Sequence, residues 1–235
     1  LKSIQHDDDI CDVKEMGMEI VNAIVKFFQE GGAFMYPIMA VFAIGAAIAI
    51  ERYVYLTVAK QKNRSIWNKL TPLVKANNYE QAMAISSRSK SEVGKIMSYG
   101  LSRLRMTKRR DDIEIAMEEG LMEVIPRLEK RTHYLATFAN IATLLGLLGT
   151  IIGLIQAFNA VANANPADKA DLLSASISVA MNTTAFGLMA AIPLLLMFTV
   201  LQTKTTEIVD SMEMATVKFL NSITEFRKEA ARSED

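Results

Sequence analysis

The sequence has little of the chemistry that soluble enzymes and nucleic-acid-binding proteins use. Its 235 residues include one cysteine, Cys11, which excludes an internal disulfide. Only two histidines are present, His6 and His133, and neither has a second ligand at a metal-binding spacing. The formal net charge is zero, whereas a nucleic-acid-binding surface needs a basic excess. We therefore expect no metal site and no nucleic-acid partner.

Motifs for catalysis are missing as well. The sequence contains no nucleophile–base pair, no glycine-rich phosphate loop and no metal-ligand cluster. We expect the protein not to be an enzyme and to bind no cofactor.

Acidic and basic residues are absent from three long apolar segments, residues 33–50, 133–164 and 172–203. A helix needs about 20 apolar residues to cross a bilayer. Burying three such helices in a soluble core would require a larger chain than this one. The sequence therefore predicts an all-α membrane protein whose three transmembrane helices contact the lipid membrane.

The distribution of positive charge predicts the orientation of the three helices. Residues 59–131 contain 16 lysines and arginines, whereas the segment before the first apolar run has three lysines and seven acids. Because positive residues flank the inner ends of membrane helices, the N-terminus is expected outside and the C-terminus inside. The predicted segments are an outer N-terminal segment with an amphipathic helix (1–32), transmembrane helices at 33–58, 133–162 and 173–203, an inner helical loop (59–132), a short outer loop (163–172) and an inner helical tail (204–235).

Helical periodicity continues into the inner segments. Within residues 111–130, an apolar stripe recurs at helical spacing: Ile113, Met117, Leu121, Val124 and Leu128. We expect this helix to run on into the second apolar segment, with a bend at Pro126. In the tail, a second stripe predicts either a coiled-coil seam or an amphipathic helix against the protein's own loop; it comprises Val209, Met212, Thr216, Phe219, Ile223 and Phe226.

Small and hydroxyl-bearing residues form one face on each of the last two apolar segments. On the second segment the spacings are 3, 4, 3, 4 and 3 for Thr143, Gly146, Thr150, Gly153, Ala157 and Ala160. On the third they are 4, 3, 4 and 3 for Ser176, Ala180, Thr183, Gly187 and Ala190, with Thr184 beside them. Small residues let membrane helices approach closely, so one interpretation is simple helix packing by Gly146, Gly149, Gly153 and Gly187.

The alternative interpretation is an ion pathway lined by these faces in an oligomer. A proton relay through a membrane usually requires a carboxylate or a histidine, and none lies between Leu135 and Thr203 outside the short outer loop. A partner helix would then have to supply the acid. The candidate pathway residues are Thr143, Thr150, Ser178, Asn182, Thr183 and Thr184.

The three apolar segments resemble the MotA/TolQ/ExbB proton-channel family, and the ExbB branch in particular. The resemblance covers residues 31–202 and is carried by "GGAFMYPIMAVFAIGAAIAIERYVYL", "LATFANIATLLGLLGTIIGLIQAF" and "TTAFGLMAAIP". It implies a homo-oligomeric, pentameric ring in a bacterial inner membrane, with the outer segments in the periplasm and the inner segments in the cytoplasm. It also implies an ExbD-like single-span partner inside the ring, whose aspartate carries the proton, and a TonB-like protein that the motor energises.

Carried over residue by residue, the resemblance matches Thr150 and Thr184 to the threonines of the family's second and third spans. Thr183 completes a double threonine that many members share. Many relatives have a glutamate five positions before the third-span threonine, where this sequence has Val179. The role of that glutamate therefore does not transfer.

Three other functions fit the same pattern. A TolQ-like subunit would serve envelope integrity instead of uptake. A flagellar or gliding stator would use the same ion pathway for torque, although residues 59–132 show no torque-interface pattern. A passive membrane scaffold would use the glycines for packing alone.

Overall fold

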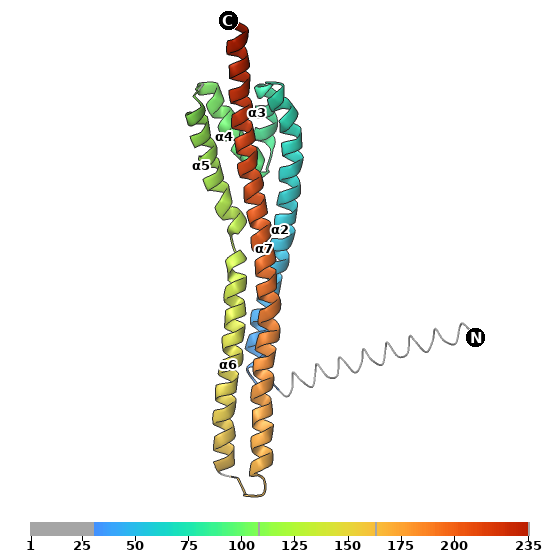
Figure 1. Cartoon of the computed structure of the whole chain (residues 1–235). Coiled ribbons are helices and arrows are strands. Elements are labelled where there is room, and N and C mark those ends of the chain that lie inside the picture. Colours follow the sequence, from blue (N-terminus) through green and yellow to red (C-terminus); the bar gives the residue numbers. More distant parts are fainter. Residues whose placement is uncertain (1–30, 108, 163, 235) are drawn as a thin grey trace, which may run out of the picture. The chain divides into compact units, whose positions relative to one another are not determined.

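The computed structural model describes residues 31–107, 109–162 and 164–234, which form helices and contain no strand (Figure 1). The predicted N-terminal amphipathic helix lies outside these residues, as does the side chain of Phe226. The helices are α2 (Met35–Lys75), α3 (Tyr79–Arg88), α4 (Glu92–Met106), α5 (Arg110–Glu129), α6 (Thr132–Ala162) and α7 (Lys169–Glu234). Three of them, α2, α6 and α7, are long and apolar enough to cross a membrane. The all-helical class with three candidate spans is thus confirmed.

The described chain divides into two compact units. The first unit contains residues 31–47 and 134–196, and the second contains residues 48–133 and 197–234. The helices α2 and α7 contribute residues to both.

The first unit has a small core of alanines and branched apolar residues. Its buried members are Ile38, Ala139, Ala142, Ala190, Ala191 and Leu194. Large apolar side chains point outward instead; Leu144, Phe158 and Met181 are each more than 60% exposed. A surface of this kind is suited to lipid or to other membrane helices, because soluble monomers rarely expose large apolar patches to water.

The second unit is built around the apolar stripe of α5. Its five members are all buried, as the periodicity predicted: Ile113, Met117, Leu121, Val124 and Leu128. The stripe of α7 is buried at Met212, Thr216, Phe219 and Ile223. The stripes of α5 and α7 both pack against α4 at Gly100. A Cβ at Gly100 would lie 2.7 Å from Met117 Cγ of α5 and 3.2 Å from Phe219 Cε1 of α7. Of the two alternatives for the tail, the structure therefore favours an amphipathic helix packed on the protein's own loop.

Polar side chains cap or join these helices. Asn78 and Ser91 accept hydrogen bonds from the backbone N–H groups of Gln81 and Gly94, which caps the N-termini of α3 and α4. Between α4 and α5, the Tyr99 hydroxyl donates to Glu123 at 2.8 Å, and this hydrogen bond to a carboxylate raises the pKa of Tyr99 above its ordinary value.

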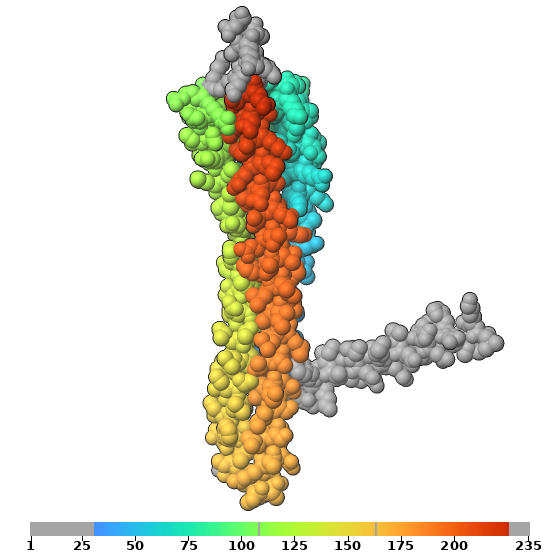
Figure 2. All heavy atoms as spheres, in the orientation of Figure 1, coloured from blue at the N-terminus to red at the C-terminus, as the bar shows by residue number. Residues whose placement is uncertain are grey.

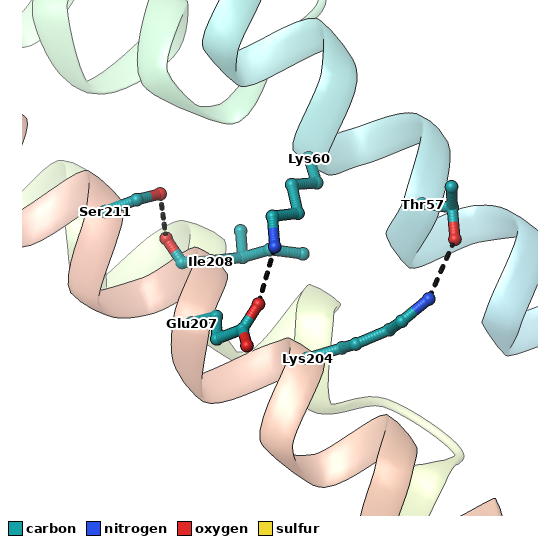
Figure 3. A network of polar contacts seen from close by, with 6 residues as sticks. All are labelled: Thr57, Lys60, Lys204, Glu207, Ile208 and Ser211. Carbon is teal, nitrogen blue, oxygen red and sulfur yellow. Dashed lines mark hydrogen bonds and ion pairs between the residues drawn. The ribbon is translucent and has the colours of Figure 1, made fainter.

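Two lysines link α2 to α7 at the surface of the second unit (Figure 3). Lys60 Nζ donates to Glu207 Oε2 at 2.5 Å, and Lys204 Nζ donates to Thr57 Oγ1 at 3.3 Å. Lys204 Nζ also lies 3.6 Å from the centre of the Tyr53 ring. The Lys60–Glu207 pair is solvent-exposed, so it contributes little to stability.

The predicted continuation of α5 into α6 is wrong. Pro126 lies inside α5, which continues to Glu129, and the interruption comes at Arg131, whose φ is +67°. Contacts from α2 hold the break in place. Arg52 Nη2 donates to the Leu128 carbonyl oxygen, and Arg131 Nη1 donates to Glu51 Oε2 at 3.4 Å. The interruption therefore depends on tertiary contacts that the local sequence does not reveal.

The left-handed conformation of Arg131 gives a first prediction. An L-residue with a Cβ pays roughly 1–2 kcal/mol in this region, a β-branched residue is a genuine outlier there, and glycine is unstrained. Arg131→Gly is expected to match or exceed the wild-type melting temperature, whereas Arg131→Val is expected to melt several degrees lower. Both variants lose the same exposed pair with Glu51, so thermal unfolding of the two in detergent isolates the backbone effect. Equal melting temperatures would show that Arg131 is not held in this conformation.

Candidate functional site

The helices α6 and α7 approach each other closely in the first unit. A Cβ added at Gly187 would lie 2.8 Å from the Ala142 carbonyl oxygen and 3.0 Å from Gly146 Cα. A Cβ at Gly146 would lie 3.3 Å from Gly187 Cα. The two helices thus touch backbone to backbone at this pair of glycines, and Figure 2 shows them side by side in the first unit. Only glycine permits such an approach.

The contact between the two helices continues on the N-terminal side of Gly187 along α7. A Cβ at Gly149 would lie 2.4 Å from Thr183 Cγ2, and a Cβ at Gly153 would lie 2.9 Å from Ala180 Cβ. All four glycines singled out in the sequence therefore lie on the α6–α7 interface.

The two adjacent threonines of α7 bond in different directions. Thr184 Oγ1 donates across the interface to the Gly146 carbonyl oxygen at 2.9 Å. Thr183 is 2% exposed, and its Oγ1 lies 2.7 Å from the Gly31 carbonyl oxygen and 2.9 Å from that of Val179. Because a hydroxyl has one proton, it donates to one of these two acceptors at a time. Thr184 thus joins α7 to α6, and Thr183 joins α7 to the residues before α2 when it donates to Gly31. Each hydroxyl keeps lone pairs that can accept a further hydrogen bond.

The threonines of α6 lie beside the packed stripe and not within it. The residues of α6 that are buried within the first unit are Leu135, Ala139, Ala142, Gly146, Gly149 and Ala157. Thr143 is exposed and Thr150 is half-buried, and their hydroxyls donate to carbonyl oxygens of α6 itself, at Ala139 and Leu147. The structure thus divides the single face that the spacing predicted into a packed stripe and a hydroxyl-bearing edge.

The remaining candidate residues lie on the same stretch of α7. Ser178 is exposed and Asn182 is half-buried. Val179, at the position where many relatives have a glutamate, approaches Gly32, whose Cβ would lie 3.2 Å from Val179 Cγ1. Gly32 has φ +73°, so the chain turns sharply into α2 beside this site.

Sequence reasoning missed the part that the start of α2 plays at this interface. The Gly31 carbonyl oxygen lies next to the Thr183 hydroxyl, and Phe34 Cβ would lie 3.4 Å from a Cβ at Gly149. The "GG" at residues 31 and 32 was the available signal, since paired glycines mark a tight turn.

The site carries hydroxyl groups and no ionisable side chain of its own. Within the described part of the first unit, the aspartates and lysine are confined to Asp168, Lys169 and Asp171, at and just after the α6–α7 loop. The described residues contain no group of three or more His, Cys, Asp or Glu side chains that could hold a metal ion. Hydroxyls can donate to or accept from a carboxyl group or a water chain, but they do not titrate near neutral pH.

Comparison with known proteins identifies similar sequences. Residues 88–214 match the model of the MotA/TolQ/ExbB proton channel family. An ExbB homolog of biopolymer transport from Methanothermobacter thermautotrophicus is 27% identical over 193 residues, covering 81% of this chain and 67% of the relative. An ExbB-like protein from Synechocystis is 28% identical over 181 residues, covering 74% and 68%. The Tol-Pal system protein TolQ of Haemophilus influenzae is 38% identical over 78 residues, covering 33% and 34%.

Proposed function

The chain belongs to the MotA/TolQ/ExbB proton channel family, and on that premise we propose that it is an ExbB-like inner-membrane subunit of a proton-driven motor. In this proposal it forms a homo-oligomeric, pentameric ring around an ExbD-like partner and energises a TonB-like protein for transport across the outer membrane. The N-terminus lies in the periplasm, and the charged segments of α2, α3–α5 and the end of α7 lie in the cytoplasm.

One observation carries the proposal. The first unit presents threonine hydroxyls at Thr143, Thr150 and Thr184 around a glycine-packed interface that contains no carboxylate. A proton pathway through a membrane needs a titratable group, so a carboxyl from a partner helix would complete it. The half-buried Thr150 and Thr184 are the hydroxyls we assign to that carboxyl.

A TolQ-like role in envelope integrity is the second candidate. It is favoured by the identity of 38% to a Tol-Pal system protein over 78 residues. Deleting the gene separates the two roles: loss of TonB-dependent uptake supports the ExbB-like role, and leakage of periplasmic proteins with a division defect supports the TolQ-like role.

Valine substitutions test the ion pathway, because valine keeps the shape of threonine and removes its hydroxyl. The Thr150→Val, Thr184→Val double variant is expected to lose proton flux and uptake by at least about tenfold, equivalent to ~1.4 kcal/mol in the activation barrier. Flux is measured in vesicles that contain the complex with its partner. Survival of both activities would leave the passive scaffold as the better account.

The single variants separate conduction from packing. Thr150 bonds only within its own helix, so Thr150→Val is expected to keep the wild-type melting temperature while losing flux. Thr184→Val also removes the bond to Gly146, so some loss of stability is expected. Thr206→Val on α7 is the matched control, because its hydroxyl bonds to the Gln202 carbonyl oxygen in the second unit. A flux defect in Thr206→Val equal to that of Thr150→Val would contradict the assignment.

A further inference from the structure

Basic side chains from three helices converge on one pocket of the second unit. The pocket has a volume of about 230 Å³, and we call it the basic pocket. Its lining residues are Tyr55, Val58, Ala59 and Lys62 of α2, Lys90 just before α4, Glu92 and Lys95 of α4, and Val124 and Arg127 of α5. Ala59 and Val124 are buried, while Lys62, Lys90 and Arg127 are exposed. The buried part of the pocket lining is therefore apolar, and the exposed basic groups lie around it.

The positive charge of the basic pocket is poorly balanced. Four cations line it, against one carboxylate, Glu92. Arg127 is paired with Glu123 at 2.7 Å. Among the residues that the structure describes, Lys62, Lys90 and Lys95 have no ion-pair partner. Like charges held around one cavity repel one another, and an anion within it would remove that repulsion.

The start of α4 adds to the positive potential. Ser91 caps this 15-residue helix, whose N-terminus lies between Lys90 and Glu92 of the pocket lining. A helix N-terminus carries a partial positive charge and favours anions. Together with three unpaired ammonium groups, it provides the environment that a phosphate group requires, because lysine binds phosphate as a point charge.

We propose that the basic pocket binds a phosphate group, and specifically the headgroup of an anionic phospholipid. The long uncharged run of α2 ends at Ile50, and Tyr55 and Val58 lie about one and a half turns and about two turns beyond it. Tyrosine is enriched at the level of lipid headgroups, and lysine side chains reach the same level from apolar surfaces. The pocket thus lies on the helix segment where a span passes into the headgroup layer. This inference does not depend on the proposed motor role.

Thermal unfolding of the full chain in neutral detergent tests the proposal. Phosphatidylglycerol added to the micelles is expected to raise the melting temperature, and phosphatidylcholine is not. In the Lys62→Gln, Lys95→Gln variant, the lipid concentration for half the effect should rise about 25-fold, or roughly fivefold for each lysine. Without lipid, this variant should melt no lower than wild type, since the substitution removes repulsion; this also verifies that it folds.

The matched control is Lys69→Gln, Arg105→Gln, which makes the same charge change on the same two helices, α2 and α4, outside the pocket lining. It should respond to phosphatidylglycerol within about twofold of wild type. Equal weakening in both double variants would overturn the proposal, because attraction would then be diffuse. Inorganic phosphate at constant ionic strength forms the second arm: a response to phosphate but not to phosphatidylglycerol would retain the phosphate site and overturn its assignment to lipid.

Discussion

Gly187→Ala is expected to be among the most damaging single-methyl additions in the protein. The new Cβ would lie 2.8 Å from the Ala142 carbonyl oxygen and 3.0 Å from Gly146 Cα. Both atoms belong to the α6 backbone, so no side-chain rotation relieves the contact, and α6 and α7 must move apart. Overpacking of this kind costs about 1–3 kcal/mol. Separation also weakens the hydrogen bond from Thr184 to Gly146, and bonds between membrane helices are worth ~0.6 kcal/mol on average.

The helix propensity of alanine opposes this loss, since alanine is favoured over glycine by about 1 kcal/mol within a helix. Whether the melting temperature falls or rises therefore tests whether the backbone contact outweighs the helix propensity of alanine. We expect a lower melting temperature in detergent and loss of proton flux in reconstituted vesicles. A stabilised Gly187→Ala protein would show that α6 and α7 do not meet as closely as the structure places them.

Two other glycines make this a graded series. A Cβ at Gly146 would meet three backbone atoms, each at 3.3 Å, so Gly146→Ala should be milder than Gly187→Ala. A Cβ at Gly45 would meet Leu194 at 2.8 Å, but through the terminal methyl groups of a flexible side chain. Gly45→Ala is therefore the matched control, and it should change stability least. Equal effects at all three positions would contradict the argument from backbone contact.

The features that could be predicted from the sequence are those that depend on local pattern. The three apolar helices follow from the absence of charge over long runs, and the buried stripe of α5 follows from its helical spacing. The placement of Gly146 and Gly187 at a helix contact follows from the preference of membrane interfaces for small residues.

The features that escaped prediction depend on contacts between distant segments. The junction of α5 and α6 forms at Arg131, and not at Pro126, because side chains of α2 bind there. The spacing of Thr143 and Thr150 predicted that they share one face of the helix with the glycines. The stripe of α6 that packs against α7 is narrower than that predicted face, and the two threonines lie beside it. The side of α6 that is packed depends on where α7 lies, and the periodicity of the α6 sequence alone does not specify that position.

The second large effect is expected from Arg52→Ala, at the junction of α5 and α6. Arg52 is 3% exposed, its Nη2 donates to the Leu128 carbonyl oxygen, and its guanidinium lies 4.7 Å from the centre of the Tyr55 ring. Substitution leaves the Leu128 carbonyl without this donor at the end of α5, which costs about 1–3 kcal/mol. The vacated volume adds a cavity term. At ~2–4 °C per kcal/mol for a chain of this size, the melting temperature should fall by roughly 5–10 °C.

Burying the guanidinium also costs stability in the wild type, because Arg52 Nε is buried without a hydrogen-bond partner. Removing the guanidinium therefore recovers part of the stability that Arg52→Ala loses. Arg52→Leu removes this cost and fills more of the volume than alanine does, so it should be less damaging than Arg52→Ala. The matched control is the adjacent Glu51→Gln, which weakens only the exposed pair with Arg131 and should change stability by less than about 0.5 kcal/mol. If Glu51→Gln were as destabilising as Arg52→Ala, the junction would be held by surface charge and not by the buried bond to Leu128. The order Arg52→Ala, Arg52→Leu, Glu51→Gln, from most to least damaging, is the order that a buried donor beneath an interrupted helix requires.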